Sequence, residues 1–341
     1  MTPPSPPASP LLEVRDLRIN LMLRGGHVSV IDGVSFAVKP GEVLALVGES
    51  GSGKSVTAQS ILRLLPRELE IASGQILFRP SSGAAVVDLA ALAPDGREMR
   101  SIRGNRIAMV FQEPMTSFSP LHTIGNQIGD VLELHRGMDR RKCNAAVAEL
   151  LDKVGIPDPI RAVDRYPHEY SGGMRQRAMV AKALACDPAL LIADEPTTAL
   201  DVTIQAQVLD LMRRLQVELG MAIIFITHDL GIVAQMADHV AIMYTGKIVE
   251  LGPVGDIFKR PQHPYTVNLL HAVPRLGRLR HWRELQPIRG AVPNLFSLPS
   301  GCTFHPRCDA CMPGLCEREF PAPRSVTENH SVSCHLFDGA A

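Results

Sequence analysis

The sequence contains no long apolar run, and this absence excludes a membrane-spanning helix of ordinary length. Its longest apolar stretches, such as "MAIIFI" at residues 221–226, fall far short of the roughly 20 residues that such a helix needs. The opening "MTPPSPPASP" has neither a basic start nor an apolar run, so it lacks the marks of a signal peptide. We therefore expect residues 1–10 to form a flexible lead and the chain to stay in the cytoplasm.

An excess of either charge is also missing. Lys plus Arg and Asp plus Glu number 35 each, so no net field draws the whole molecule to nucleic acid or anionic lipid. Apolar residues make up 45% of the chain, which indicates a globular protein rather than a disordered one. At 341 residues, the chain exceeds one typical domain and has room for a main domain and an appendage.

Cysteine is scarce except near the end, where four of the seven cysteines lie within residues 302–316. In a reducing cytosol, clustered cysteines hold metal or carry out redox chemistry more often than they form disulfides. Cys308 and Cys311 form a thiol pair with two intervening residues, and His305 lies nearby, which favours zinc.

The hydrophobic pattern predicts an α/β fold. Residues 11–47 alternate short β-rich runs with turn dipeptides, which indicates an antiparallel layer that leads into one buried strand. Further along, two apolar strands, "ALLIAD" and "AIIFIT", flank a helical stretch, and this order is typical of βαβ units in a parallel sheet. Residues 124–154 have helical periodicity and predict a helical subdomain inserted into the core, with Cys143 as a surface thiol.

The first motif with a chemical meaning is "GESGSGKS", residues 48–55, between a predicted buried strand and a predicted helix. It fits the phosphate-loop pattern, in which glycines let successive N–H groups wrap the β- and γ-phosphates at a helix N-terminus. Lys54 would neutralise phosphate charge, and the Ser55 hydroxyl would ligate Mg²⁺. The predicted nucleotide-binding residues of this loop are Gly48, Ser50, Gly51, Gly53, Lys54 and Ser55.

A second motif, "LLIADEP" at residues 190–196, is an apolar strand that ends in two carboxylates. We expect Asp194 to hold the hydration shell of Mg²⁺ and Glu195 to polarise the attacking water. Alone, such a pair is more often a helix cap or a solvated turn. The phosphate loop upstream favours the catalytic interpretation.

A third motif, "YSGGMRQRAMVAKAL", opens a helix with Ser171, Gly172 and Gly173. Serine is a good helix N-cap, and the free N–H groups of the first turn form a second anion site. The alternative is an ordinary capped helix. Two phosphate-binding helix ends in one chain raise the question of why both are needed.

Taken together and in this order, the motifs resemble the nucleotide-binding subunit of an ATP-binding-cassette transporter. The resemblance adds Gln112, "ALD" ending at Asp201, and His228 in "ITHD" to the three motifs above. It implies a cassette domain at residues 11–258 with a phosphate-loop (RecA-like) core, an antiparallel β subdomain, and a helical subdomain at about residues 113–175.

The same resemblance implies a sandwich of two ATPase subunits. Lys54 and Ser55 of one subunit would hold ATP, while Ser171 and Gly173 of the other would close over its γ-phosphate. This arrangement would explain two anion sites in one chain. Asp201 would then lie at the dimer interface.

Further roles follow from the resemblance alone. His228 would contact the γ-phosphate and position the water near Glu195. Gln112 would join Ser55 and Asp194 at Mg²⁺ and would begin the segment that couples the site to the membrane subunits. Two positions depart from the family pattern. Met174 stands in the signature where the family often has glutamine, which is tolerable because the serine and the glycine N–H groups do the binding. Near Leu21, where an aromatic side chain commonly stacks on adenine, no aromatic residue is present.

Three further segments resemble one branch of these transporters, the ATPases of dipeptide, oligopeptide and nickel importers. They are "RGNRIAMVFQEPMTSFSP", "KRPQHPYTVNLLHAVP" and "GAVPNLFSLPSGCTFHPRC". Residues 259–341 would then be the small cysteine-containing C-terminal extension of that branch. The branch implies peptide import, or alternatively import of nickel or another metal chelate.

This membership implies specific partners and a location. The partners are two integral membrane permeases, an extracytoplasmic solute-binding protein and a second ATPase subunit, either a paralogue or a second copy. The chain would act peripherally at the cytoplasmic face of the inner membrane.

Other classes that share the cassette fit less well. Nucleic-acid-processing ATPases usually add long coiled coils or zinc modules within the cassette, and they carry a basic footprint, whereas this chain has none of these. Soluble translation-factor ATPases ordinarily contain two cassettes, and one is present here. We therefore expect a transporter subunit with no nucleic-acid partner.

The branch also changes the interpretation of the thiols. Its pattern implies a four-thiolate set of Cys302, Cys308, Cys316 and Cys334, which resembles the ligands of a four-iron four-sulfur (4Fe–4S) cluster. Cys311 would be spare, and its pairing with Cys308 leaves zinc as the alternative.

Overall fold

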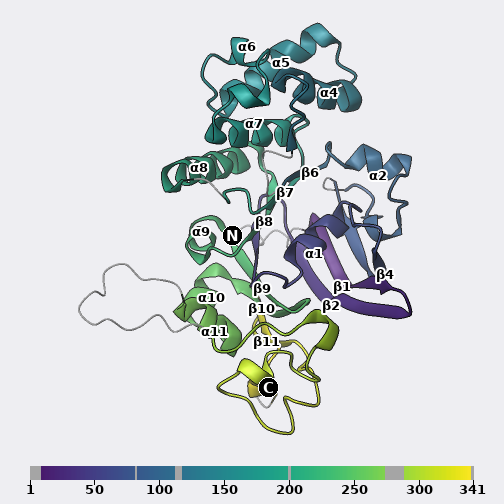
Figure 1. Ribbon diagram of the computed structural model, residues 1–341, viewed down its shortest axis with the longest axis vertical. Coiled ribbons are helices and arrows are strands. Elements are labelled where there is room, and N and C mark those ends of the chain that lie inside the picture. The colour runs from purple at the N-terminus through teal and green to yellow at the C-terminus, as the bar shows by residue number, and fades with distance from the viewer. Residues whose placement is uncertain (1–8, 81–82, 112–116, 199–200, 273–287, 339–341) are drawn as a thin grey trace, which may run out of the picture.

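A computed structural model describes residues 9–80, 83–111, 117–198, 201–272 and 288–338. Strands in these ranges form two sheets, seen at the right and in the centre of Figure 1. The first is antiparallel with the order β2-β1-β4-β5. Its strands are β1 (Leu12–Leu23), β2 (Gly26–Val38), β4 (Leu69–Phe78) and β5 (Val87–Asp88).

The second sheet is mixed and has the order β11-β12-β10-β9-β3-β8-β7-β6. Five neighbouring strands pair in parallel, in the order β9, β3, β8, β7 and β6. The strands β10, β12 and β11 extend the sheet beyond β9 by antiparallel pairing. The strands are β3 (Val43–Val47), β6 (Ile107–Val110), β7 (Leu190–Asp194), β8 (Ala222–Thr227), β9 (His239–Tyr244), β10 (Lys247–Pro253), β11 (Arg324–Thr327) and β12 (His330–Val332).

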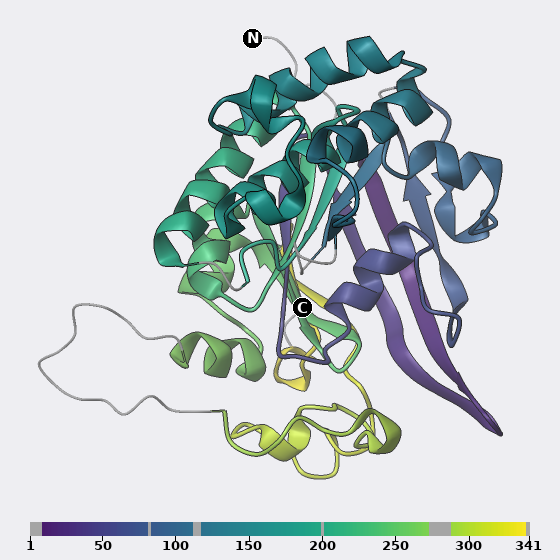
Figure 2. The same cartoon turned by 45° about the horizontal axis from the view of Figure 1, so that its top comes forward.

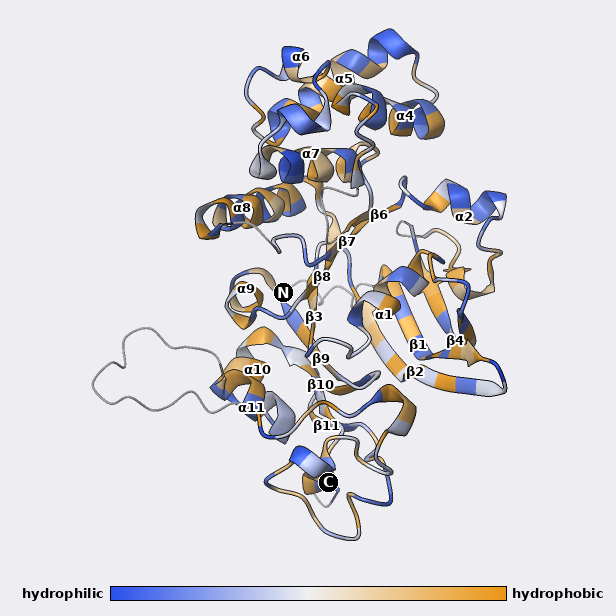
Figure 3. Cartoon of the chain, in the orientation of Figure 1, coloured by the Kyte–Doolittle hydropathy of each residue, from blue (hydrophilic) through white to orange (hydrophobic). Residues whose placement is uncertain are grey.

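Both faces of the parallel strands are covered, which is why their sequences are continuously apolar. Along β8, Ile223 and Phe225 enter the core cluster that the helical subdomain shares, whereas Ile224 and Ile226 enter the cluster shared with the antiparallel sheet. Alternate side chains of one strand thus join two cores. Figure 3 shows mainly hydrophobic colours along the central strands near β6, β7 and β8, and both hydrophilic and hydrophobic residues on the surrounding helices.

The helices lie around the sheets. They are α1 (Lys54–Ile61), α2 (Arg97–Ile102), α4 (Ile124–Arg136), α5 (Arg140–Lys153), α6 (Pro159–Ala162), α7 (Gly172–Leu184), α8 (Val202–Leu219), α9 (Leu230–Met236), α10 (Val254–Lys259) and α11 (Pro264–His271). Figures 1 and 2 both show α4 to α7 gathered at one end of the molecule. None of the helices in the described ranges combines the length and apolarity needed to span a membrane.

Cys143 lies inside this helical group, so the expectation of a surface thiol is wrong. Its residue is 1% exposed, and its thiol lies 3.6 Å from the carbonyl oxygen of Gly129. The charged residues that precede Cys143 in sequence occupy the outer face of α5. Cys143 shares the inner face with Val147 and Leu151, which follow at intervals of four residues.

The C-terminal extension is built onto the mixed sheet. Its strand β12 pairs with β10 at Glu250 and Leu251, and β11 pairs with β12. A third core cluster joins Phe304 and Tyr265 of the extension to side chains of β3 and β9. The boundary at residue 258 remains a prediction, but the two segments share a sheet and a core.

Candidate functional site

The loop between β3 and α1 follows a path that glycine alone permits at two positions. A Cβ on Gly48 would lie 2.2 Å from the carbonyl oxygen of Met243. Gly53 has a φ of +99°, and a Cβ there would lie 2.4 Å from Cδ1 of Ile31. The loop therefore packs directly on β9 and β2, with the N-terminus of α1 behind it.

Lys54 is buried within this loop. Its ammonium donates to the carbonyl oxygens of Gly48 at 2.8 Å and Glu49 at 3.0 Å. Burial lowers the pKa of Lys54, and the carboxylates of Glu195 and Asp194 oppose this effect. The three charged groups are thus close enough to influence one another.

Ser55 and Asp194 meet where α1 begins and β7 ends. The Ser55 hydroxyl donates to Oδ1 of Asp194 at 3.1 Å. Asp194 is 5% exposed, and this burial raises the pKa of its carboxyl, although the bond from Ser55 acts in the opposite direction. A hydroxyl and a carboxylate oxygen are the donors that Mg²⁺ prefers, so these two residues fit that ion beside bound phosphates.

Glu195 and His228 come from the ends of neighbouring parallel strands, β7 and β8. Nδ1 of His228 lies 3.2 Å from Oε1 of Glu195, and the Thr198 hydroxyl donates to Oε2 at 3.0 Å. The backbone N–H of Glu195 donates to the carbonyl oxygen of Ile226 at 2.9 Å. Carboxyl ends of parallel strands lie at one sheet edge, which is why residues 33 positions apart meet here.

The predicted second anion site is the N-terminus of α7. The Ser171 hydroxyl caps this helix by accepting from the N–H of Met174 at 3.3 Å. Around an ideal Cβ on Gly172, no heavy atom lies within 4 Å among the described residues, whereas one on Gly173 would meet Ile204 at 2.9 Å. α7 packs on α4, α5, α8 and β6, while α1 packs on β7. The two predicted anion sites thus lie on helices that join different core clusters, α7 in the one that includes the helical subdomain and α1 in the one that includes the antiparallel sheet.

The remaining predicted residues are distributed as follows. Gly51 has a φ of +79° with open space beside it, and Ser50 is exposed on the same loop. Asp201 caps α8 by accepting from the N–H of Ile204 at 2.9 Å. Gln112 and residues 199–200 lie outside the described ranges. Leu21 pairs with Val28 and Leu69 across the antiparallel sheet.

Two functional candidates were missed by sequence reasoning, Glu49 and Arg307. The Arg307 guanidinium donates to both carboxylate oxygens of Glu49, at 2.8 and 3.1 Å. The sequence did contain a signal. A carboxylate inside a phosphate-binding loop repels phosphate unless a cation neutralises it, so the presence of Glu49 in this loop indicates that a cationic side chain lies beside it.

The predicted iron–sulfur cluster is contradicted. Among the described residues, which include all seven cysteines, no group of three or more His, Cys, Asp or Glu side chains could hold a metal ion, so zinc is not supported either. Cys302, Cys308, Cys316 and Cys334 line a cavity of about 10 Å³, room for roughly one water molecule. Burial raises the pKa of Cys302 and Cys308 to about 11, so both are thiols at neutral pH in the metal-free chain.

A phosphate-binding loop, a residue pair suited to Mg²⁺ and a carboxylate beside it define a phosphate-loop nucleoside triphosphatase. Residues 31–198 match the family model described as ABC transporter, and residues 249–316 match that of the oligopeptide/dipeptide transporter C-terminal region. The chain belongs to the ATP-binding subunits of the ABC transporter family, and it is an ATPase of that family.

Relatives cover nearly the whole chain. A Brucella ovis protein that is named a peptide import ATP-binding protein is 54% identical over 330 residues, which cover 95% of this chain and 96% of the relative. The dipeptide transport ATP-binding protein DppD of Bacillus subtilis is 48% identical over 332 residues, which cover 97% and 96%.

A solved structure of the ATP-binding cassette MJ0796, described as a dimeric post-hydrolysis state bound to ADP and Pi, has the same fold. It covers 71% of this chain and 98% of its own, with a TM-score of 0.62 and 24% identity. The predicted α/β cassette fold is therefore confirmed, apart from the cysteine-containing extension.

Proposed function

We propose that this chain hydrolyses ATP to power the import of peptides through an ABC transporter. One observation carries the substrate class: relatives at 48–54% identity over nearly the full chain are named for peptide, dipeptide or oligopeptide transport. The match of residues 249–316 to the oligopeptide/dipeptide transporter C-terminal region supports it.

The phosphate loop would bind the nucleotide. Loop N–H groups and the N-terminus of α1 attract the β- and γ-phosphates, and Lys54 neutralises their charge. Ser55 and Asp194, joined by a 3.1 Å hydrogen bond, would hold Mg²⁺, with Gln112 as a further proposed ligand. When bound, Mg²⁺ draws negative charge from the β- and γ-phosphate oxygens.

Glu195 would act as the general base. It takes the proton of a water whose oxygen attacks the γ-phosphorus, while the bond to the leaving ADP oxygen breaks. The bonds to Thr198 and His228 support this role because they orient both carboxylate oxygens. His228 would contact the γ-phosphate from the same side.

ATP would be enclosed between two subunits. Ser171, Gly172 and Gly173 of one subunit would close over the γ-phosphate held by the other, and Asp201 would lie at that interface. Support comes from the separate packing of α1 and α7, and from the dimeric state named for the MJ0796 cassette.

The helical subdomain would receive a permease at the cytoplasmic face of the inner membrane, with an extracytoplasmic binding protein delivering peptide. A hollow of about 490 Å³ between β6 and α7 supports this docking. Its described lining includes Met109, Met179 and the exposed ring of Phe111, and among these described residues Lys182 is the one cation. Such a lining suits the apolar face of a short helix whose carboxyl end or acidic residue meets Lys182.

Two substitutions test the enzymatic part. We expect Glu195→Gln to bind ATP while turnover falls by a factor on the order of 10²–10⁴, because the base is lost but the phosphate loop is intact. Lys54→Ala should instead weaken ATP binding. Nucleotide affinity and phosphate release measure both, and wild-type turnover in Glu195→Gln would refute the assignment.

The substrate class needs the assembled transporter. Reconstituted with its permeases and binding protein, the complex should show ATPase stimulation and uptake with peptides. If a nickel chelate stimulated the ATPase and peptides did not, the proposed substrate class would be metal chelates rather than peptides.

A further inference from the structure

Arg307 of the C-terminal extension contacts the phosphate loop directly. Its side chain is 4% exposed, and its two terminal nitrogens bond the two carboxylate oxygens of Glu49, at 2.8 and 3.1 Å. Paired bonds of this kind fix the orientation as well as the distance of a carboxylate. Hydrogen bonding to Glu49 raises the pKa of Arg307, so the arginine remains charged.

Glu49 is held through its main chain as well. Its N–H donates to the Tyr265 hydroxyl at 3.0 Å, and its carbonyl oxygen accepts from Lys54 at 3.0 Å. Tyr265 lies on α11, so it belongs to the extension like Arg307. A continuous path of hydrogen bonds therefore runs from the extension through Glu49 to the ammonium of Lys54.

Further contacts hold the Arg307 side chain in place. The guanidinium carbon lies 5.8 Å from the ring centre of Tyr244 and 5.9 Å from that of Phe304, and the Arg307 Nε–H donates to the carbonyl oxygen of Arg289 at 2.9 Å. The rings of Tyr244, Tyr265 and Phe304 pack on one another, with centroids 4.7 to 5.3 Å apart.

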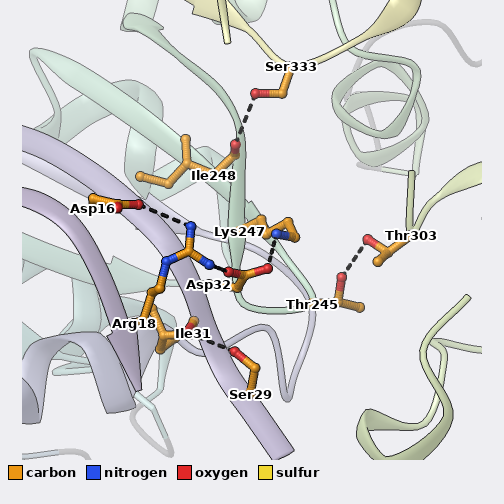
Figure 4. A network of polar contacts seen from close by, with 10 residues as sticks. All are labelled: Asp16, Arg18, Ser29, Ile31, Asp32, Thr245, Lys247, Ile248, Thr303 and Ser333. Atoms are coloured by element: carbon orange, nitrogen blue, oxygen red, sulfur yellow. Dashed lines mark hydrogen bonds and ion pairs between the residues drawn. The ribbon is translucent and has the colours of Figure 1, made fainter. Parts of the chain in front are cut away.

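The extension also bonds to the turn between β9 and β10. Figure 4 shows the hydroxyls of Thr303 and Thr245 facing each other and Ser333 reaching the carbonyl oxygen of Ile248 at the start of β10. The two threonine hydroxyl oxygens lie 2.6 Å apart. On the other side of the same turn, Lys247 and Arg18 both contact Asp32 of β2. The extension and the antiparallel sheet thus hold this turn from two sides.

We propose that Arg307 is a positioning residue for the phosphate loop, and that through it the C-terminal extension sets the affinity of the loop for ATP. The inference rests on the proposed role of the loop in ATP binding. Arg307 neutralises the Glu49 carboxylate, which would otherwise repel the phosphates, and it fixes the peptide that holds Lys54.

The test compares Arg307→Gln, Glu49→Gln and the double variant in the full chain. We expect Arg307→Gln to raise the KM for ATP on the order of tenfold, within the range of typical coupling between sites, with kcat within about twofold. Adding Glu49→Gln removes the unpaired carboxylate. The KM of the double variant should therefore be no higher than that of Arg307→Gln.

Controls separate this inference from its premise. Arg324→Gln is the matched control, because Arg324 is a half-exposed arginine of the extension that faces Asp338 at 3.6 Å, and its KM should equal the wild-type value. Tyr265→Phe, which removes a single hydroxyl, should raise KM in the same direction and serves if Arg307→Gln fails to fold.

Three results would overturn the proposal: a wild-type KM in both Arg307→Gln and Tyr265→Phe, effects of Arg307→Gln and Glu49→Gln that multiply, or a fall in kcat at constant KM. Wild-type ATP binding by Lys54→Ala would instead refute the loop's proposed function, whatever Arg307 does.

Discussion

Glu195 has a backbone conformation that few residues other than glycine adopt. Its φ is +45°, and such conformations cost on the order of 1–3 kcal/mol. The bond from its N–H to Ile226 and the bond that Thr198 donates to its carboxylate hold it there. Such backbone strain is consistent with a residue whose side-chain direction matters for function, even though its backbone conformation costs folding stability.

His263 predicts how folding stability depends on pH. Burial lowers its pKa to about 3, well below the ordinary value near 6.5, because no partner in the described part of the chain bonds its Nε2. Above pH 6.5 neither state binds the proton. As pH falls from 6.5 toward 3, the unfolded state binds a proton that the folded state refuses, so stability is lost.

We expect the free energy of unfolding to fall by up to about 1.4 kcal/mol per pH unit below 6.5 through this residue. His263→Asn is the comparison, since asparagine can keep the cap that Nδ1 provides to the N–H of Tyr265 but does not titrate. Urea unfolding at pH 7.5, 6.5 and 5.5 measures both slopes. Equal slopes would show that His263 does not govern the acid side.

At the scale of single residues, the sequence predicted groups with a local pattern and missed those with a distant partner. Lys54, Asp194 and Glu195 follow from motifs that place them at a strand end or a helix start. The sequence could indicate that Glu49 needs a cation but not that this cation is Arg307, because the two residues lie 258 positions apart. The thiol prediction failed for a different reason: spacing in the sequence suggested ligands, but in the described part of the chain the fold does not bring three of them into a group that could hold a metal ion.

Among the elements, the turn between β9 and β10 carries a strict steric requirement. Gly246 has a φ of +78°, and a Cβ on it would lie 2.1 Å from the carbonyl oxygen of Val30. Its N–H donates to the carbonyl oxygen of Ser52, and its own carbonyl accepts from Asp32. The turn is therefore fitted between the phosphate loop and β2.

Gly246→Ala should destabilise the protein more than Gly25→Ala does. Both substitutions place a side chain at positive φ, but Gly25, at +113°, has no described heavy atom within 4 Å of an ideal Cβ. The difference isolates the clash, and we expect it to be about 1–3 kcal/mol in urea unfolding. Equal losses would mean that the turn moves away without cost.

Element types were more predictable than their partners. Periodicity indicated the helical group, the antiparallel layer and the parallel strands, since each pattern reflects the faces that an element buries. It did not predict that β12 would join β10, because short strands of the extension carry no marker of which edge they pair with.

For the whole molecule, the proposed sandwich makes each site composite, and mixing two inactive variants tests this. Lys54→Ala and Ser171→Arg should each lose activity as the chain alone. A mixed dimer contains one site with Lys54 of one subunit and Ser171 of the partner subunit, both intact. We therefore expect mixing to restore up to about a quarter of the wild-type rate, as half the dimers are mixed with one intact site each.

Mixing each variant with itself at the same total concentration is the control. If Ser171 served the site of its own subunit, no mixture would gain activity, because every site would then carry one substitution or the other. Phosphate release after preincubation of the two variants measures the outcome.

The contact between β10 and β12 has a consequence for the order in which the protein matures. The Glu250 carboxylate is fully buried, and it bonds His330, which lies 80 residues further along the chain, at 2.8 Å. During synthesis the cassette emerges first, with this acid still lacking its partner. The sheet that carries the nucleotide-binding motifs is thus completed only after the hairpin of β11 and β12 leaves the ribosome. A chain that stalls or is clipped before this hairpin would contain all of these motifs on an incomplete sheet.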